Sequence, residues 1–112
     1  MYYLPRAVAD GSDAEARAGM LLAAYYGGIC LGPVNTAAGH ALAYPLGTRL
    51  KLPHGLANAI MLPSVLRFSL PAAAPQLARL ARRVGIAGRS ETVLARKFVG
   101  LVREAQGSRA PA

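Results

Sequence analysis

The chain has 112 residues, one cysteine and a formal net charge of +8. Its length limits it to one small domain. A single cysteine excludes a disulfide within the chain and indicates a reducing, cytoplasmic compartment. Hydrophobic residues make up 54% of the sequence and aromatic residues only 6%, so the apolar content is mainly alanine and leucine, which favour helices over strands. A small domain this apolar leaves surface for another body to cover, and we expect a homo-oligomer, or a further domain or subunit, to cover it.

The first two predicted elements are helices. Residues 2–8 resemble the final turns of a helix. The capping-box pattern from Ser12 to Glu15 predicts a second helix that begins near Asp13 and runs to about Gly27.

Residues 18–34 form the run that most resembles a membrane span, but the run is short for a bilayer and is interrupted by glycines and by Pro33. We therefore expect a buried core helix, covered on several sides, and no membrane insertion.

A third helix is predicted from a cap at Asn35 or Thr36 to about Tyr44, where Pro45 and Gly47 end it. The short segment that follows links it to the next element.

Pro53 suits the first position of a fourth helix that extends to Phe68, with a kink at Pro63. The proline-rich segment 69–75 is predicted to break that helix.

The sequence then predicts a helix over residues 74–84 and a last helix over residues 91–105 that is capped by Ser90. Residues 107–112 are expected to form a disordered tail. No segment shows the alternation of a strand, so the predicted fold class is all-α, a helical bundle.

The only two histidines, His40 and His54, lie on either side of the predicted helix breaks. On one straight helix they would be about 21 Å apart and could not share a ligand. The breaks allow the chain to fold back and bring both imidazoles, in the neutral form that binds metals, to one point. The alternative is two ordinary histidines, one facing the core and one at a surface helix start.

A metal site would still lack ligands, because zinc or iron takes three or four, commonly with a carboxylate. None of the five acidic residues lies between His40 and His54. Cys30 could be a third ligand but is explained more simply as a small core residue. If a metal binds, further ligands therefore come from outside this chain.

The arginines are scattered, and no aromatic residues alternate with them as in a platform for single-stranded nucleic acid. We therefore expect solvated helix faces and no nucleic-acid binding. The alternative is a basic helical protein that contacts nucleic acid through Arg79, Arg82, Arg83, Arg96 and Arg103.

The segments "GHALAYPLG" and "LPHGLANAIMLPSVLRF" strongly resemble the signature of the iron-containing alcohol dehydrogenases, the family that also includes maleylacetate reductases. The match extends over residues 39–68. The resemblance implies a two-domain NAD(P)-dependent enzyme in which residues 1–106 form part of the helical C-terminal metal-binding domain. In that family an Asp and three His bind one divalent iron or zinc ion, and the last two of these ligands match His40 and His54. The ion would polarise the alcohol or carbonyl oxygen during hydride transfer.

The sequence also departs from the family pattern. The D-x-x-x-H helix with the first two ligands and the NAD(P)-binding α/β domain are both absent from this chain, so we expect neither NAD(P) binding nor activity from the chain alone. Tyr44 stands where many members have a second histidine near the substrate, which makes it a candidate for the substrate pocket or, alternatively, a buried aromatic residue. The alternative function is a non-catalytic helical metal-binding or interaction module that oligomerises.

Overall fold

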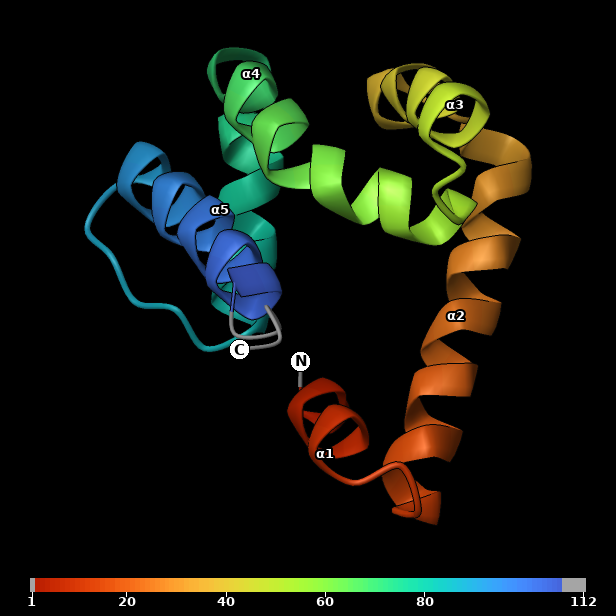
Figure 1. Ribbon diagram of the computed structural model, residues 1–112. Helices are drawn as coiled ribbons and strands as arrows, with labels where there is room; N and C mark the ends of the chain where they lie inside the picture. Colours follow the sequence, from red (N-terminus) through yellow and green to blue (C-terminus); the bar gives the residue numbers. More distant parts are fainter. Residues whose placement is uncertain (1, 108–112) are drawn as a thin grey trace. The chain divides into compact units, whose positions relative to one another are not determined.

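The computed structural model describes residues 2–107, and all five elements in this part of the chain are helices. Figure 1 shows these helices, which are α1 (Tyr3–Ala9), α2 (Ala14–Val34), α3 (Ala38–Leu50), α4 (His54–Arg83) and α5 (Glu91–Gly107). The predicted all-α class is confirmed. The chain divides into two compact units, residues 1–36 and 37–112. The predicted tail 107–112 lies outside the described residues, apart from Gly107 at the end of α5.

The first unit is a short helix followed by a long one. Helix α2 begins at Ala14 as predicted, but its N-cap is Asp13, whose carboxylate accepts a hydrogen bond from the backbone N–H of Ala16 at 3.0 Å. The Ser12 hydroxyl instead donates to the Asp10 carboxylate at 2.6 Å. Arg6 of α1 forms ion pairs with Asp13 at 2.9 Å and with Glu15 at 2.8 Å, so the same carboxylates join α1 to the start of α2.

The expectation that α2 is a buried core helix is wrong. The helix continues past Gly27 to Val34, and Ala16 is its only buried residue. Residues 21–34 are exposed, including Cys30, which is therefore not a core residue. The physical reason is that the only other helix of this unit, α1, has seven residues and packs near the N-terminal part of α2, where the ring of Tyr3 lies against Gly19.

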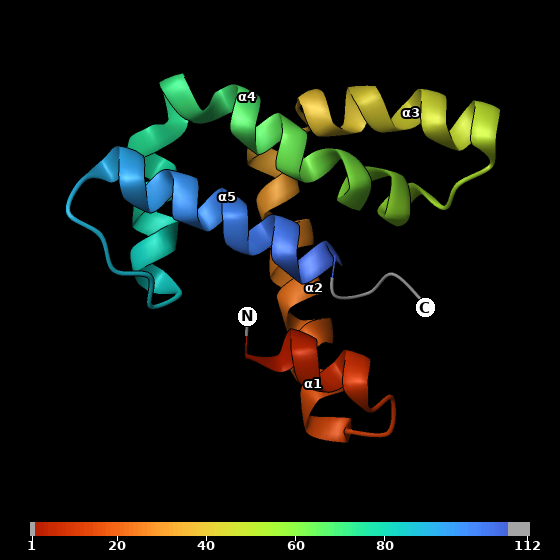
Figure 2. The ribbon, with the colours of Figure 1, turned by 60° about the vertical axis from the view of Figure 1, so that its left-hand side comes forward.

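The core of the second unit lies between α4 and α5, which Figures 1 and 2 show side by side. Its buried side chains are small or aliphatic: Leu77, Ala78, Ala81, Leu94, Ala95 and Val99. Alanines on both helices allow a close approach of their backbones. At the start of α5 the Ser90 hydroxyl accepts a hydrogen bond from the backbone N–H of Val93 at 3.3 Å, which confirms the predicted cap.

The prolines interrupt the helices less than predicted. Helix α3 continues through Pro45 and Gly47 to Leu50, where Lys51 ends it in a left-handed conformation with φ 57°. Neither Asn35 nor Thr36 caps it, because its N-cap is Ala37 and no side chain bonds there. A proline inside a helix removes one N–H donor but keeps a helical φ, so the tertiary packing of this helix against α4 can hold it together.

Helix α4 is likewise continuous across segment 69–75, and the predicted break there is wrong. Its N-cap is Pro53, so the helix begins one residue later than predicted, and it contains Pro63, Pro71 and Pro75. Figures 1 and 2 show that α4 bends in its proline-containing part. Pro63, where the sequence predicts a kink, lies inside the helix. The bend allows its first part to lie along α3 and its last part along α5.

By length and hydropathy alone, α4 rather than residues 18–34 meets the criterion for a membrane span among the described residues. This is weak support for a span, because core helices of other proteins meet the same criterion.

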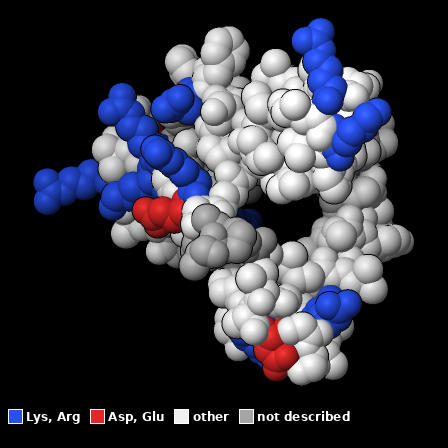
Figure 3. Space-filling model, viewed as in Figure 1, with Lys and Arg blue, Asp and Glu red and all other residues white. Residues whose placement is uncertain are grey.

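Positive charge gathers on the second unit. Figure 3 shows lysine and arginine side chains over the α4–α5 pair. The five arginines of the predicted alternative surface are all exposed, with three near the end of α4 and two on α5. Phe98 is the one aromatic residue between Arg79 and Arg103 in sequence, and it packs against the α4–α5 core, so the surface has charge but lacks a stacking platform.

Candidate metal centre

The turn between α3 and α4 brings the two histidines to one place. After Leu50 the backbone doubles back, and the carbonyl oxygen of Leu52 lies 3.6 Å from where a Cβ on Gly47 would be. Helix α4 therefore starts beside the middle of α3 and not beyond its end. Ala43 and Ala57 are the buried residues of α3 and of the first part of α4, and these small side chains let the two helices approach closely.

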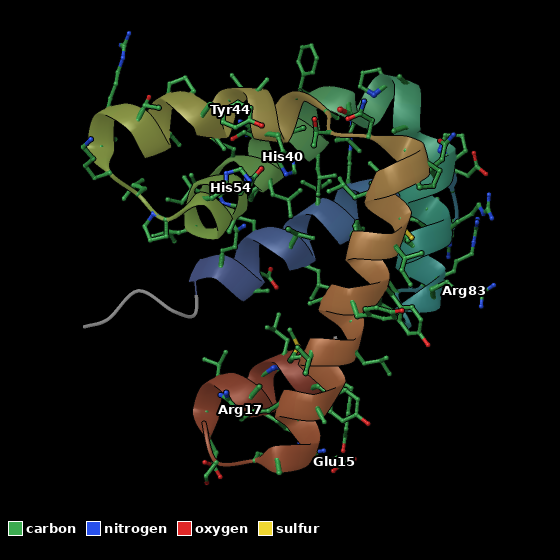
Figure 4. All side chains as sticks on the ribbon, turned by 90° about the vertical axis from the view of Figure 1, so that its right-hand side faces the viewer. Glu15, Arg17, His40, Tyr44, His54 and Arg83 are labelled. Atoms are coloured by element: carbon green, nitrogen blue, oxygen red, sulfur yellow. The ribbon has the colours of Figure 1, made fainter. Side chains whose placement is uncertain are left out.

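His40 and His54 point toward one another from α3 and α4 (Figure 4), with their ring centroids 5.2 Å apart and their planes at 50°. Two imidazoles bound to one ion at metal–nitrogen distances of about 2.1 Å and a tetrahedral angle place their centroids roughly 5 Å apart. The donor type and the spacing therefore fit two positions of a zinc or iron site. The structure brings the predicted pair together.

Tyr44 lies beside the two histidines. One helical turn after His40, its ring stacks on His54 with a centroid distance of 5.9 Å and an interplanar angle of 30° (Figure 4). The alternative of a buried aromatic residue is wrong, because Tyr44 is 58% exposed. His54 is also exposed, whereas His40 is half-buried, so the site formed by the three rings is open to solvent.

Asn58 is a site residue that the sequence reasoning missed. Its amide nitrogen donates to the backbone oxygen of His54 at 3.0 Å and lies 3.2 Å from Nε2 of the same histidine. The signal was present in the sequence, because residues four apart on a helix face each other and Asn58 lies one turn after His54.

The described residues, 2–107, contain no group of three or more His, Cys, Asp or Glu side chains that could hold a metal ion. Cys30 belongs to the other unit and is exposed. A cavity of about 450 Å³ between α4 and α5 includes Arg67 and Arg103 but neither histidine. The chemistry that the pair offers is therefore that of two imidazole nitrogen donors, without a third donor beside them among the described residues.

Comparison with known proteins gives a consistent result. The model of the "Fe-containing alcohol dehydrogenase family, C-terminal" matches residues 1–106. The 1-propanol dehydrogenase PduQ of Salmonella typhimurium is 41% identical over 85 residues, 74% of this chain and 23% of that protein. An NAD-dependent methanol dehydrogenase of Bacillus methanolicus is 33% identical over 99 residues, 87% of this chain and 26% of that protein. Maleylacetate reductase 2 of Cupriavidus pinatubonensis is 40% identical over 85 residues, 76% of this chain and 24% of that protein.

The chain spans about a quarter of the length of these relatives. No solved structure matches it. The family match extends over both structural units and includes the residues around His40 and His54, where the sequence resembles the signature of the family. The chain belongs to the Fe-containing alcohol dehydrogenase family, as part of its helical C-terminal domain.

Proposed function

We propose that this chain provides two ligands, His40 and His54, for the divalent iron or zinc ion of an NAD(P)-dependent enzyme that interconverts alcohols and carbonyl compounds. The observation that carries the proposal is the 5.2 Å separation of the two imidazole rings, which suits two ligands of one ion. Membership of an iron-containing family and similarity to an NAD-dependent methanol dehydrogenase support the choice of metal and cofactor.

A divalent ion, when bound, supplies polarisation of the substrate oxygen. The residues of this chain contribute the rest of the local arrangement. His40 and His54 present their lone pairs from two different helices, so the packing of α3 on α4 sets the distance between them. Tyr44 places a hydroxyl-bearing ring at the exposed edge of the pair, where it can contact the substrate.

The remaining ligands and the nicotinamide site would come from protein outside this chain. Two donors do not complete a zinc or iron site, and the relatives are about four times as long as the matched segment. The chain alone is therefore inactive in our proposal, and the complete enzyme works in the cytoplasm. The exposed apolar surface of α2, with Leu21, Tyr25 and Val34 between 64% and 76% exposed, suits contact with that further domain or subunit.

A second candidate is a non-catalytic metal-binding module completed by another copy of the chain. The observation in its favour is the same pair of donors, with no third metal-binding side chain grouped with them among the described residues. It requires self-association that depends on metal and disappears in His40→Ala. A complementing domain or subunit requires no such behaviour from the isolated chain.

The test is metal content by mass spectrometry on the full chain purified without oxygen. Wild type is compared with the His40→Ala/His54→Ala double variant and with Cys30→Ser, which removes the only thiol of the chain. We expect iron or zinc in wild type and in Cys30→Ser, its loss in the double variant, and no turnover of alcohol with NAD(P) in any of them. Equal metal content in wild type and the double variant would contradict the proposal.

A further inference from the structure

The contacts of Asn58 carry an inference about how His54 is prepared as a ligand. An amide nitrogen has two N–H groups. One of them donates to the backbone oxygen of His54 at 3.0 Å, and because a carbonyl oxygen only accepts, this bond fixes which end of the amide faces His54. The amide nitrogen, and not the amide oxygen, therefore lies 3.2 Å from Nε2.

The second N–H of the Asn58 amide then determines which nitrogen of the His54 ring carries the proton. A nitrogen that faces a donor has to be an acceptor, so Nε2 of His54 carries a lone pair and the ring proton of the neutral imidazole is on Nδ1. With the proton on Nε2, two N–H groups would face each other. Asn58 thus favours one of the two neutral tautomers.

The amide oxygen of Asn58 faces helix α3. Asn58 is half-buried, and its amide oxygen lies 3.8 Å from where a Cβ on Gly39 would be. The residue next to Gly39 is His40. The amide is thus placed between the backbone that carries one histidine and the ring of the other, with its oxygen toward α3 and its nitrogen toward His54.

We propose that Asn58 is a positioning residue that holds His54 as the Nδ1–H tautomer and keeps the lone pair on Nε2 for a divalent cation. The part that concerns the cation rests on the proposed function, whereas the tautomer does not. A hydrogen bond of 3.2 Å is at the long end of the normal range, so a cation can displace the amide from Nε2 more easily than it can displace a ring proton. Nε2 of His54 thus carries its lone pair before any metal binds.

The test is the tautomer of His54 in the metal-free full chain, read from ¹⁵N chemical shifts of the ring nitrogens at about pH 9, where histidine side chains are neutral. We expect Nε2 to carry the lone pair in wild type. Asn58→Leu, which has a similar shape and no donor, should give a mixture of tautomers. Asn58→Asp, which has the same shape but only accepts hydrogen bonds, should move the proton to Nε2.

The His40 signals serve as an internal control and should stay unchanged in both variants if the helices remain packed. A packing role alone would alter both histidines or neither. The same tautomer in wild type and both variants would overturn the inference, and so would a wild-type ring with its proton on Nε2. If Asn58→Leu fails to fold, the wild-type spectrum and the isosteric Asn58→Asp decide.

A titration with Zn²⁺ separates this inference from the proposed function. A cation on Nε2 breaks the amide hydrogen bond, so the favoured tautomer and the lost hydrogen bond act on Zn²⁺ affinity in opposite directions. We therefore expect Asn58→Leu to change Zn²⁺ affinity by no more than about threefold, and His54→Ala, which lacks the ligand itself, to bind at least about tenfold more weakly than wild type. If wild type binds no Zn²⁺ while the tautomers follow the expected pattern, the proposed metal role of this chain fails and the action of Asn58 on the tautomer is supported. If wild type binds Zn²⁺ while the tautomer of His54 is the same in all three chains, the positioning role of Asn58 is overturned while the metal site stands.

Discussion

The ring of Tyr44 stacks on the ring of His54, with centroids 5.9 Å apart, and His40 reaches the same place from one turn earlier on α3. Three rings from two helices thus share one exposed site (Figure 4). The position of Tyr44 is close enough to the pair to add a third ligand by a single substitution.

We predict that Tyr44→His raises the affinity of the full chain for Zn²⁺ by at least about tenfold, because it adds a third imidazole to a pair that lacks further ligands. Isothermal titration calorimetry with Zn²⁺ measures the effect. Tyr25→His is the matched control, since it adds the same side chain to an exposed position of α2. Equal gains in Zn²⁺ affinity in the two variants would show that the effect does not depend on placing the imidazole beside His40 and His54.

Gly19 and Gly28 of α2 should respond in opposite ways to alanine. A Cβ on Gly19 would overlap the ring of Tyr3, whereas a Cβ on Gly28 meets nothing within 4 Å. We expect Gly19→Ala to destabilise the packing of α1 on α2 by about 1 kcal/mol net of its better helix propensity. Gly28→Ala should stabilise α2 by a similar amount, about 1 kcal/mol.

Hydrogen exchange of the α1 amides provides the local measurement for this pair. The amides of α1 should exchange faster in Gly19→Ala and at an unchanged rate in Gly28→Ala. Unchanged α1 exchange in Gly19→Ala would mean that Tyr3 does not hold α1 against α2.

The α4–α5 core depends on Leu94, which is 2% exposed and is the largest fully buried side chain among the described residues. We expect Leu94→Ala to lower the free energy of unfolding of the second unit by about 3 kcal/mol. Leu80→Ala, at a position that is 49% exposed, should cost about 0.5 kcal/mol or less. Urea unfolding followed by circular dichroism measures both, and equal costs would contradict the assigned core.

The start of α2 should be sensitive to acid. Hydrogen bonds from Arg6, and then from the backbone N–H of Ala16, hold the pKa of the Asp13 carboxyl below its ordinary value of 3.8. Because the pKa is lower in the folded state, Asp13 contributes its full stabilisation above about pH 3.8 and loses it as the pH falls through the folded value.

An NMR pH titration of the Asp13 carboxyl, together with α1 amide exchange below pH 4, tests this effect. We expect the α1 amides to lose protection in acid in wild type, and we expect Asp13→Asn to show the lower protection already at neutral pH. Glu104→Gln, on α5 of the other unit, should behave as wild type. An Asp13 carboxyl that titrates above its ordinary value would contradict the assigned ion pair.

Local sequence features determined where several helices begin. Side chains that bond to free backbone N–H groups act within a few residues, so the starts of α2 near Asp13 and of α5 after Ser90 could be predicted from short patterns. The apolar and alanine-rich composition likewise determined the helical class. The resemblance around residues 39–68 gave the family, which the match over residues 1–106 confirms.

The effects of proline and the pattern of burial were decided by the tertiary structure. Pro45 and the prolines of segment 69–75 were predicted to end helices, yet α3 and α4 continue through them, because packing against neighbouring helices offsets the loss of one N–H donor at each proline. Burial of α2 depends on which partner lies against it, and sequence periodicity does not reveal a partner.

The candidate site shows the same division. The sequence by itself determined which residues carry the metal-binding chemistry, because His40 and His54 are its only imidazoles. Only the tertiary structure decided that the backbone after Leu50 doubles back, so that the two rings lie 5.2 Å apart with Asn58 bonded to one of them. The reason is physical: side-chain chemistry is fixed by residue type, whereas the distance between two side chains on different helices depends on how those helices pack.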